Sequence, residues 1–182
     1  MLGAGATVAV AALAAACSSG TEPRITAANP LADSADQVMF GVSTMITDQG
    51  VMRAQLQADT AYFFDGSTRV VVRHERTTFY TSTGEQNAVL TSEDGMYNMS
   101  TGLMEATKNV VVVTTDGKRL ETSQLRYDQR SNLVSGDSAF VLTQPTGRLQ
   151  GIGFTSDPNL TSLKVKKVKT GGGTFTLPGG TQ

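Results

Sequence analysis

Turn-forming residue pairs recur along most of this chain, and their spacing limits what the chain can fold into. Asp-Gly and Thr-Gly pairs supply the positive φ of a hairpin turn, and proline fixes a turn position. The signals are Asp65-Gly66, Thr83-Gly84, Asp94-Gly95, Thr101-Gly102, Asp116-Gly117, Gly136-Asp137, Gln144–Gly147 and Asp157–Asn159. Most lie about 8 to 15 residues apart, a spacing typical of short antiparallel strands joined by hairpins. We therefore expect an all-β fold in two facing sheets, with no long helix between about Asp36 and Lys169.

A short pattern repeats within this region. The copies AQLQAD, AVLTSE and SQLRYD start at Ala54, Ala88 and Ser123, so they are 34 and 35 residues apart. Each copy has a leucine two residues after its start and an acid three residues later, at Asp59, Glu93 and Asp128. A glycine precedes each copy, and a weaker fourth copy covers residues 151–157. Such a period indicates stacked units that share a core, each long enough for four ordinary strands. Chance similarity of short strand patterns is the alternative.

Alternating polarity predicts which face of the sheet is buried. In residues 52–59 the apolar side chains take even positions, while Arg53, Gln55 and Gln57 take odd ones and face water. One inserted residue moves the inward positions of the third copy to odd numbers. The predicted interior residues are Met52, Ala54, Leu56, Ala58, Val70, Val72, Ala88, Leu90, Ser123, Leu125 and Tyr127. Because small side chains leave room, we expect an open groove able to hold acyl chains. A closed sandwich core is the alternative.

The run Val110–Val113 is apolar at every position. An alternating strand would expose half of these side chains to water. We therefore expect this strand to be covered on both faces or to lie beside a lipid-facing rim.

The only cysteine, Cys17, follows an uncharged apolar run. Residues 1–16 are too short to span a bilayer, which takes roughly 20 apolar residues, but they suit a secretory signal. The sequence LAAAC resembles a bacterial lipobox, in which the cysteine is lipidated and becomes the mature N-terminus. Cys17 is therefore predicted to be a lipid attachment point. An ordinary signal peptide with an incidental cysteine is the alternative.

These features divide the chain into four parts. Residues 1–16 are predicted to form a signal peptide, and the polar residues 17–35 are predicted to form a flexible tether. Residues 36–169 are predicted to form the β domain, and the Gly-rich residues 170–182 are predicted to form a disordered tail.

The composition offers little for catalysis, metal binding or nucleic-acid binding. A net charge of −1 gives no general attraction to nucleic acid, and one histidine with one distant cysteine cannot build a zinc site. His74 lies among Arg73, Glu75 and Arg76, which predicts a solvated charged face. The three acids of the repeats are predicted to form turns that end strands. We therefore expect neither an enzyme nor a cofactor or metal.

Residues 163–169, LKVKKVK, form the one charge run. Lysines of this kind guard an edge strand against unwanted pairing. Alternatively, Lys164, Lys166 and Lys167 contact a partner's strand or the phosphates of a lipid head group.

Two adjacent segments carry a family resemblance. ETSQLRYDQRSNLVSGDSAFVL, residues 121–142, is followed by GRLQGIGFTSDPNLTSLKV, residues 147–165. After an anchored N-terminus and the repeated strand ends, this order resembles the LptC proteins, lipopolysaccharide-export components of the OstA-like family. The match is best over residues 119–165 and extends from about residue 36.

The resemblance implies an antiparallel β-jellyroll, open along one side, whose interior binds the acyl chains of lipid A. Family members take lipopolysaccharide from the permeases of an inner-membrane ABC transporter. They pass it to a periplasmic bridge protein of the same fold by pairing sheet edges. Energy comes from the transporter, so this chain needs no nucleotide site. The family's usual anchor is a transmembrane helix, which a lipid on Cys17 would replace.

Location and function class follow from these features as expectations. The chain is expected in the periplasm, lipid-anchored to the inner membrane, although Ser18 after the cysteine is an outer-membrane sorting signal in enterobacteria. The main functional hypothesis is lipopolysaccharide relay. The alternatives are a structural or adhesive surface lipoprotein with a closed β-sandwich and, more remotely, a secreted hydrolase.

Overall fold

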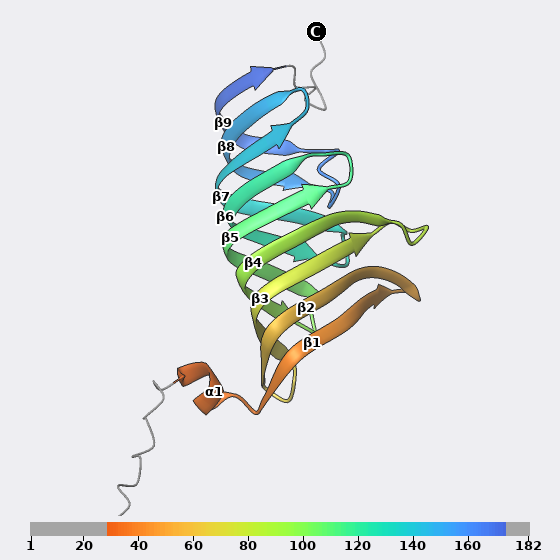
Figure 1. Ribbon diagram of the computed structural model, residues 1–182, viewed down its shortest axis with the longest axis vertical. Helices are drawn as coiled ribbons and strands as arrows, with labels where there is room; N and C mark the ends of the chain where they lie inside the picture. Colours follow the sequence, from red (N-terminus) through yellow and green to blue (C-terminus); the bar gives the residue numbers. More distant parts are fainter. Residues whose placement is uncertain (1–28, 174–182) are drawn as a thin grey trace, which may run out of the picture.

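The computed structural model describes residues 29–173, which form nine antiparallel strands in a single sheet (Figure 1). The strands are β1 (Gln37–Asp48), β2 (Val51–Phe64), β3 (Arg69–Tyr80), β4 (Gln86–Asn98), β5 (Leu103–Thr114), β6 (Arg119–Asp128), β7 (Leu133–Gln144), β8 (Gly147–Ser156) and β9 (Lys164–Gly173). Hydrogen bonding follows chain order from β1 to β9, so every strand pairs with its sequence neighbours. The predicted all-β antiparallel fold is confirmed.

One short helix precedes the sheet in the described part of the chain. It is α1 (Pro30–Ser34), which begins after Asn29, whose Oδ1 accepts a hydrogen bond from the Leu31 amide at 3.3 Å. The Asn29 Nδ2 donates to the Tyr62 hydroxyl at 2.9 Å, which ties the helix to β2. Between residues 29 and 173, no helix is both long and apolar enough to cross a membrane.

Bulges near the middle of the strands bend the sheet back on itself. In β5 the pairing with β6 shifts between Thr107 and Val110, where Lys108 and Asn109 have φ angles of 63° and 50°. Bulges of this kind increase the local bend and twist of a strand. In Figure 1 the two halves of the strands join along the left of the view and lie one behind the other. The two expected layers are thus halves of one continuous sheet, consistent with an open β-jellyroll.

Two of the predicted turns are bulges instead. Asp94-Gly95 lies inside β4 and Gly136-Asp137 inside β7, each beside a register shift with a neighbouring strand. A glycine in a strand interior marks a bulge or a close approach of another chain segment. At Gly136 an added Cβ would lie 2.8 Å from a Phe154 ring carbon, so glycine admits that ring. The Asp-Gly and Gly-Asp pairs do mark irregular backbone, but the prediction of turns at these two places was wrong.

Each repeat is a hairpin of two long strands. The glycines before the copies stand at the turns that begin β2, β4 and β6. The strands that follow reach 14 residues in β2 and 13 residues in β4. The prediction of four ordinary strands per repeat was wrong, because each long strand bends in its middle and contributes a segment to both halves.

Two rows of inward-facing side chains cross the sheet, one on each half. The residues of the first row pair in the order Leu56, Thr77, Leu90, Val112, Leu120, Leu142 and Leu149. Those of the second row pair in the order Phe63, Val70, Tyr97, Met104, Tyr127, Val134 and Ser156. The halves meet where Phe79 packs edge-on against Tyr127, with ring centroids 5.0 Å apart. The hydrophobic core therefore lies between the two halves.

Candidate functional site

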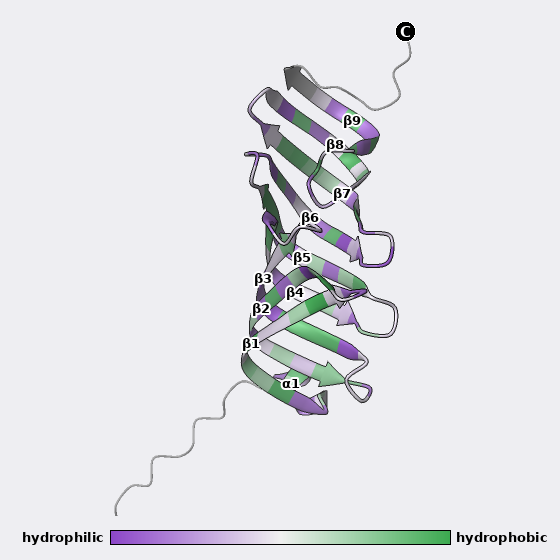
Figure 2. Cartoon of the chain, turned by 90° about the vertical axis from the view of Figure 1, so that its right-hand side faces the viewer, coloured by the Kyte–Doolittle hydropathy of each residue, from purple (hydrophilic) through white to green (hydrophobic). Residues whose placement is uncertain are grey.

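An apolar cavity of about 290 Å³ opens between the two halves at the β1 end of the sheet. Its wall includes the apolar side chains Val42, Ile46, Leu56, Phe63, Val70 and Val72. At its rim lie the exposed Thr44 on β1 and Met99 in the β4–β5 turn, which is 55% exposed. Figure 2 views the open side of the molecule, with α1 and β1 at one end and β9 at the other. The cavity is therefore accessible at the end where the described chain begins.

Gln129, in the β6–β7 turn, ties the β1 edge to the opposite wall of the cavity. Its Nε2 donates to the Thr47 carbonyl oxygen at 2.9 Å, and its Oε1 accepts from the Tyr97 hydroxyl at 3.3 Å. Burial raises the pKa of Tyr97, so the hydroxyl stays a neutral donor near neutral pH. These two bonds hold the rim in one shape. Sequence reasoning missed Gln129 because its contact with Thr47 joins the β6–β7 turn to β1, which lie far apart in the chain.

Beyond the cavity, side chains fill the space between the halves. A volume of about 10 Å³ remains among Phe79, Leu90, Leu125 and Tyr127. Burial raises the pKa of Tyr127 to about 12, and its hydroxyl donates to Asn132 Oδ1 at 3.1 Å. The interior is therefore open at the β1 end and packed from β3 to β6.

The predicted interior residues divide between these two parts. Leu56, Val70 and Val72 line the cavity. The predicted residues that are buried elsewhere in the core are Ala54, Ala58, Ala88, Leu90, Leu125 and Tyr127. Met52 is half-buried and pairs with Thr47 next to the β1–β2 turn. Their inward orientation agrees with the alternation, and contact with lipid stays a prediction.

Ser123 was predicted to face inward and is exposed. The pairing of β6 with β7 is interrupted between Thr122 and Arg126, so the inward positions begin again at Leu125. Leu56 and Leu90 belong to the first row, whereas Leu125 pairs with Ala106 on the second half. The third copy of the repeat is therefore displaced along its strand relative to the first two.

The three acids of the repeats do not share one role. Asp128 ends β6 and accepts a hydrogen bond from the Arg130 amide at 2.9 Å, as predicted for a turn-former. Asp59 and Glu93 lie inside β2 and β4, on the exposed face beside the bend. His74 Nδ1 lies 3.1 Å from Asp59 Oδ2. The prediction that these two acids end strands was wrong.

His74 is exposed, as predicted, but its neighbour Glu75 is not. His74 has a φ angle of 49°, and this left-handed residue shifts the alternation of β3 by one position. Glu75 consequently faces the interior and is 5% exposed. Burial raises its pKa to about 7, an effect partly opposed by the hydrogen bond that Ser92 Oγ donates at 2.8 Å. The placement of Glu75 on a solvated face was wrong, because the sequence does not mark which residue forms the bulge.

The four valines of β5 are covered on one face only. Val110 and Val112 are buried in the core, whereas Val113 is 41% exposed on the outer face. Val111 and Val89 line a shallow depression there. The expectation that this strand is covered on both faces was wrong, and its alternative, a place beside a lipid-facing rim, stays a prediction.

The lysine-rich segment lies at an edge of the sheet, as expected for lysines that guard an edge strand. Lys164 begins β9, which is the last strand of the sheet and pairs with β8 alone within residues 29–173. Lys166 Nζ lies 2.6 Å from Asp137 Oδ1, and Lys167 is exposed. The segment is therefore an edge strand, and its contact with a partner stays a prediction.

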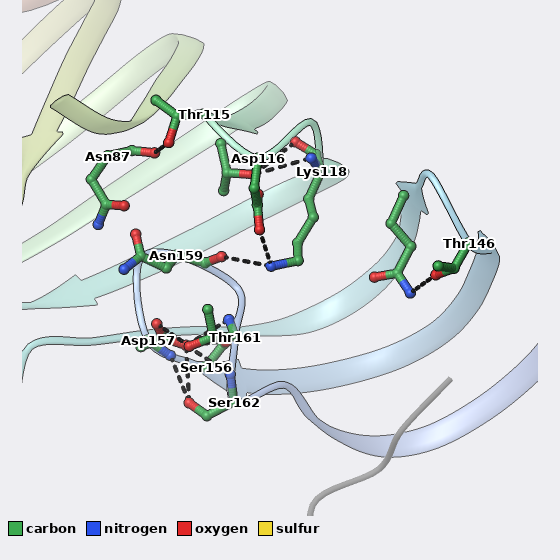
Figure 3. Close-up of polar contacts among 12 residues, drawn as sticks. Asn87, Thr115, Asp116, Lys118, Thr146, Ser156, Asp157, Asn159, Thr161 and Ser162 are labelled. Carbon is green, nitrogen blue, oxygen red and sulfur yellow. Dashed lines mark hydrogen bonds and ion pairs between the residues drawn. The ribbon is translucent and has the colours of Figure 1, made fainter. Parts of the chain in front are cut away.

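The β8–β9 loop folds back over the core toward the β5–β6 turn, where Lys118 Nζ donates to the Asn159 carbonyl oxygen at 3.5 Å. Leu160 and Leu163 are buried. Asp157 accepts hydrogen bonds from the amides of Thr161 and Ser162, each at 2.8 Å (Figure 3). Although burial raises it, these bonds and those from the two hydroxyls hold the pKa of Asp157 at about 2. The predicted turn at this place is therefore an ordered loop that covers part of the core.

An antiparallel sheet bent around an accessible apolar cavity defines this chain as an open β-jellyroll protein. The chain matches the family described as "Lipopolysaccharide-assembly, LptC-related" over residues 6–171, which is more than half of its length. The chain belongs to this family, and it is a component of lipopolysaccharide transport. A comparison with curated proteins gives no match.

Family membership confirms the resemblance found in the sequence. The family consists of periplasmic, membrane-associated transport and binding proteins rather than enzymes. Cys17 and Ser18, and with them the predicted signal peptide and anchor, lie outside the described residues.

Proposed function

We propose that this protein binds lipopolysaccharide by inserting acyl chains into the cavity at the β1 end. One observation carries this proposal: the cavity of about 290 Å³ has an apolar wall and is open to solvent beside an edge strand. Transfer of acyl chains from water to such a surface is favourable, by about 25 cal/mol per Å² of apolar area buried. Because Thr44 and Met99 at the rim are exposed, the carbohydrate and phosphate groups of a ligand bound in this way would remain in solvent.

Within residues 29–173 the sheet has two unpaired edges, β1 and β9, and these support a relay with a direction. β1 carries the exposed apolar side chains Met39, Phe40 and Met45, whereas β9 carries the lysines. The β1 end is also nearest in sequence to Cys17, so it would face the membrane and the permeases of the inner-membrane ABC transporter. Lipopolysaccharide would enter the cavity there and leave toward a periplasmic bridge protein of the same fold, paired on the β9 edge. A structural or adhesive role is less well supported, because the sheet is open rather than a closed sandwich.

A crosslinking experiment tests where the ligand lies. A photoreactive amino acid at Leu56, on the cavity wall, should capture lipopolysaccharide in cells, whereas one at Gln57 should not. The two positions are adjacent in β2, and Gln57 is exposed on the opposite face. Thr44 and Ser43 form a second matched pair on β1, since Thr44 lines the cavity and Ser43 accepts a hydrogen bond from Gln55 on the other face. Equal capture from both faces would contradict the proposal.

The anchor is tested separately. We propose that Cys17 is lipidated and holds the protein to the inner membrane, since one acyl chain gives only marginal attachment and several give a stable one. The intact mass of the protein from its native membrane should begin at Cys17 and include acyl groups. Cys17→Ala should release the protein into the soluble periplasmic fraction. A native protein with an unmodified Cys17 would contradict lipidation, and recovery in the outer membrane would favour sorting by Ser18.

A further inference from the structure

Five polar side chains are buried among residues 29–173, and three of them lie together on β3 and β4. Glu75, Thr77 and Ser92 are 5%, 1% and 7% exposed, and we refer to them as the polar cluster. Glu75 and Ser92 pair across β3 and β4 and are joined by the 2.8 Å hydrogen bond between their side chains. Thr77 stands between Leu56 and Leu90 in the first row, where the other residues are aliphatic. Lipid binding alone gives no reason for polar groups at this place.

The polar cluster lies directly beyond the inner end of the cavity. Thr77 pairs with Leu56, which lines the cavity wall. Gly95 pairs with Val72, another wall residue, and a Cβ at Gly95 would lie 2.3 Å from Glu75 Oε2 and 2.7 Å from Val72 Cγ2. The Glu75 carboxyl group therefore lies close to the cavity wall. A chain that fills the cavity and reaches further inward would meet these polar groups next.

One atom of the polar cluster has no hydrogen-bond partner. Thr77 Oγ1 is buried and unpaired among residues 29–173. Leaving such a group unpaired costs about 1 to 3 kcal/mol, and buried hydroxyls in native proteins usually have a partner. Beside it, burial brings the pKa of Glu75 to about 7, so this carboxyl group exchanges between donor and acceptor forms near neutral pH. The cluster thus has hydrogen-bonding capacity that the protein itself does not use.

We infer that the polar cluster is a subsite for a hydroxyl group carried by the aliphatic chain in the cavity, an inference that rests on the proposed lipid binding. A hydroxyl group accepts a hydrogen bond from Thr77 Oγ1 and donates one to Glu75, whereas a plain hydrocarbon chain does neither. The free volume of about 10 Å³ between the cluster and Tyr127 is close to that of one water-sized probe. It admits a hydroxyl group and excludes a sugar or a phosphate.

Binding of simple fatty acids to the full chain tests this inference. Tetradecanoate, 3-hydroxytetradecanoate and 12-hydroxytetradecanoate are compared by displacement of a fluorescent fatty acid. At least one hydroxylated acid should bind about three- to tenfold more tightly than tetradecanoate, the value of one net hydrogen bond. Thr77→Val removes the hydroxyl and keeps the shape, so it should abolish this preference. Thr78→Val, on the opposite face of β3, should keep the preference.

The outcomes separate the subsite from the cavity. Equal binding of the three acids to the wild-type protein would overturn the hydroxyl subsite, while tetradecanoate binding would still support the proposed function. A preference that survives Thr77→Val would also overturn the subsite. If none of the acids binds, the proposed cavity function fails and the subsite fails with it.

Discussion

Replacing Leu90 by aspartate should cost most of the stability of the fold. Leu90 is 3% exposed and stands in the first row between Thr77 and Val112. The substitution removes a buried apolar side chain and places an unpaired charge in the packed interior, a penalty of several kcal/mol. Because domains of this size are stable by about 5 to 15 kcal/mol, we expect a loss of about 4 kcal/mol or more. Urea unfolding followed by circular dichroism measures it.

Val89 provides the matched control for this substitution. It precedes Leu90 in β4, is half-buried and lies on the outer face beside a shallow depression. Val89→Asp should therefore lower the free energy of unfolding by about 1 kcal/mol or less. Similar losses for the two variants would show that the alternation of β4 has been assigned to the wrong faces. Lipopolysaccharide relay should fail for Leu90→Asp through loss of the folded protein.

The second large effect is a pH dependence that Glu75 brings to stability. Burial favours the neutral carboxyl group, so its pKa in the folded protein is about 7, against 4.5 for the group in solution. Its stabilising contribution is fully present below pH 4.5 and is lost as the pH rises to about 7. A shift of this size corresponds to about 3 kcal/mol. Asp157, whose pKa is about 2, titrates below this range.

Glu75→Gln measures this contribution directly. Glutamine keeps the shape and remains neutral, so the variant should gain stability relative to the wild-type protein by about 3 kcal/mol between pH 4.5 and pH 8. The free energy of unfolding of both proteins is measured by urea titration across this range. Glu85→Gln, at an exposed position of the β3–β4 turn, controls for the loss of one charge. Parallel curves for the wild-type protein and Glu75→Gln would show that Glu75 is solvated.

Local sequence signals were sufficient for the fold class and for much of the interior. The turn at Asp65-Gly66 joins β2 to β3, and Ala54, Leu56 and Leu90 are buried as their alternation predicts. These features depend on neighbours along the chain, because hairpin turns need particular backbone angles and a strand has a period of two. The family resemblance rested on the same strand order and is supported over residues 6–171.

The errors cluster at the bend. Asp94-Gly95 was expected to be a turn, Ser123 was expected inside, and Glu75 was expected in water, yet each stands beside a bulge. A bulge adds one residue to one strand and moves every following side chain to the other face. Its position depends on the partner strand, so it has no reliable mark in the sequence of its own strand.

The sequence by itself determined an antiparallel β protein, its hairpins and its family, and it predicts a lipid anchor at Cys17. Only the tertiary structure decided where the interior is open, where it is packed, and that Glu75 and Thr77 lie between these parts. Hairpins form between residues close in the chain, whereas the cavity depends on how the two halves of a bent sheet meet. Where the two halves pack together, residues far apart in the sequence come into contact, such as Thr47 and Gln129, and no local pattern specifies this contact.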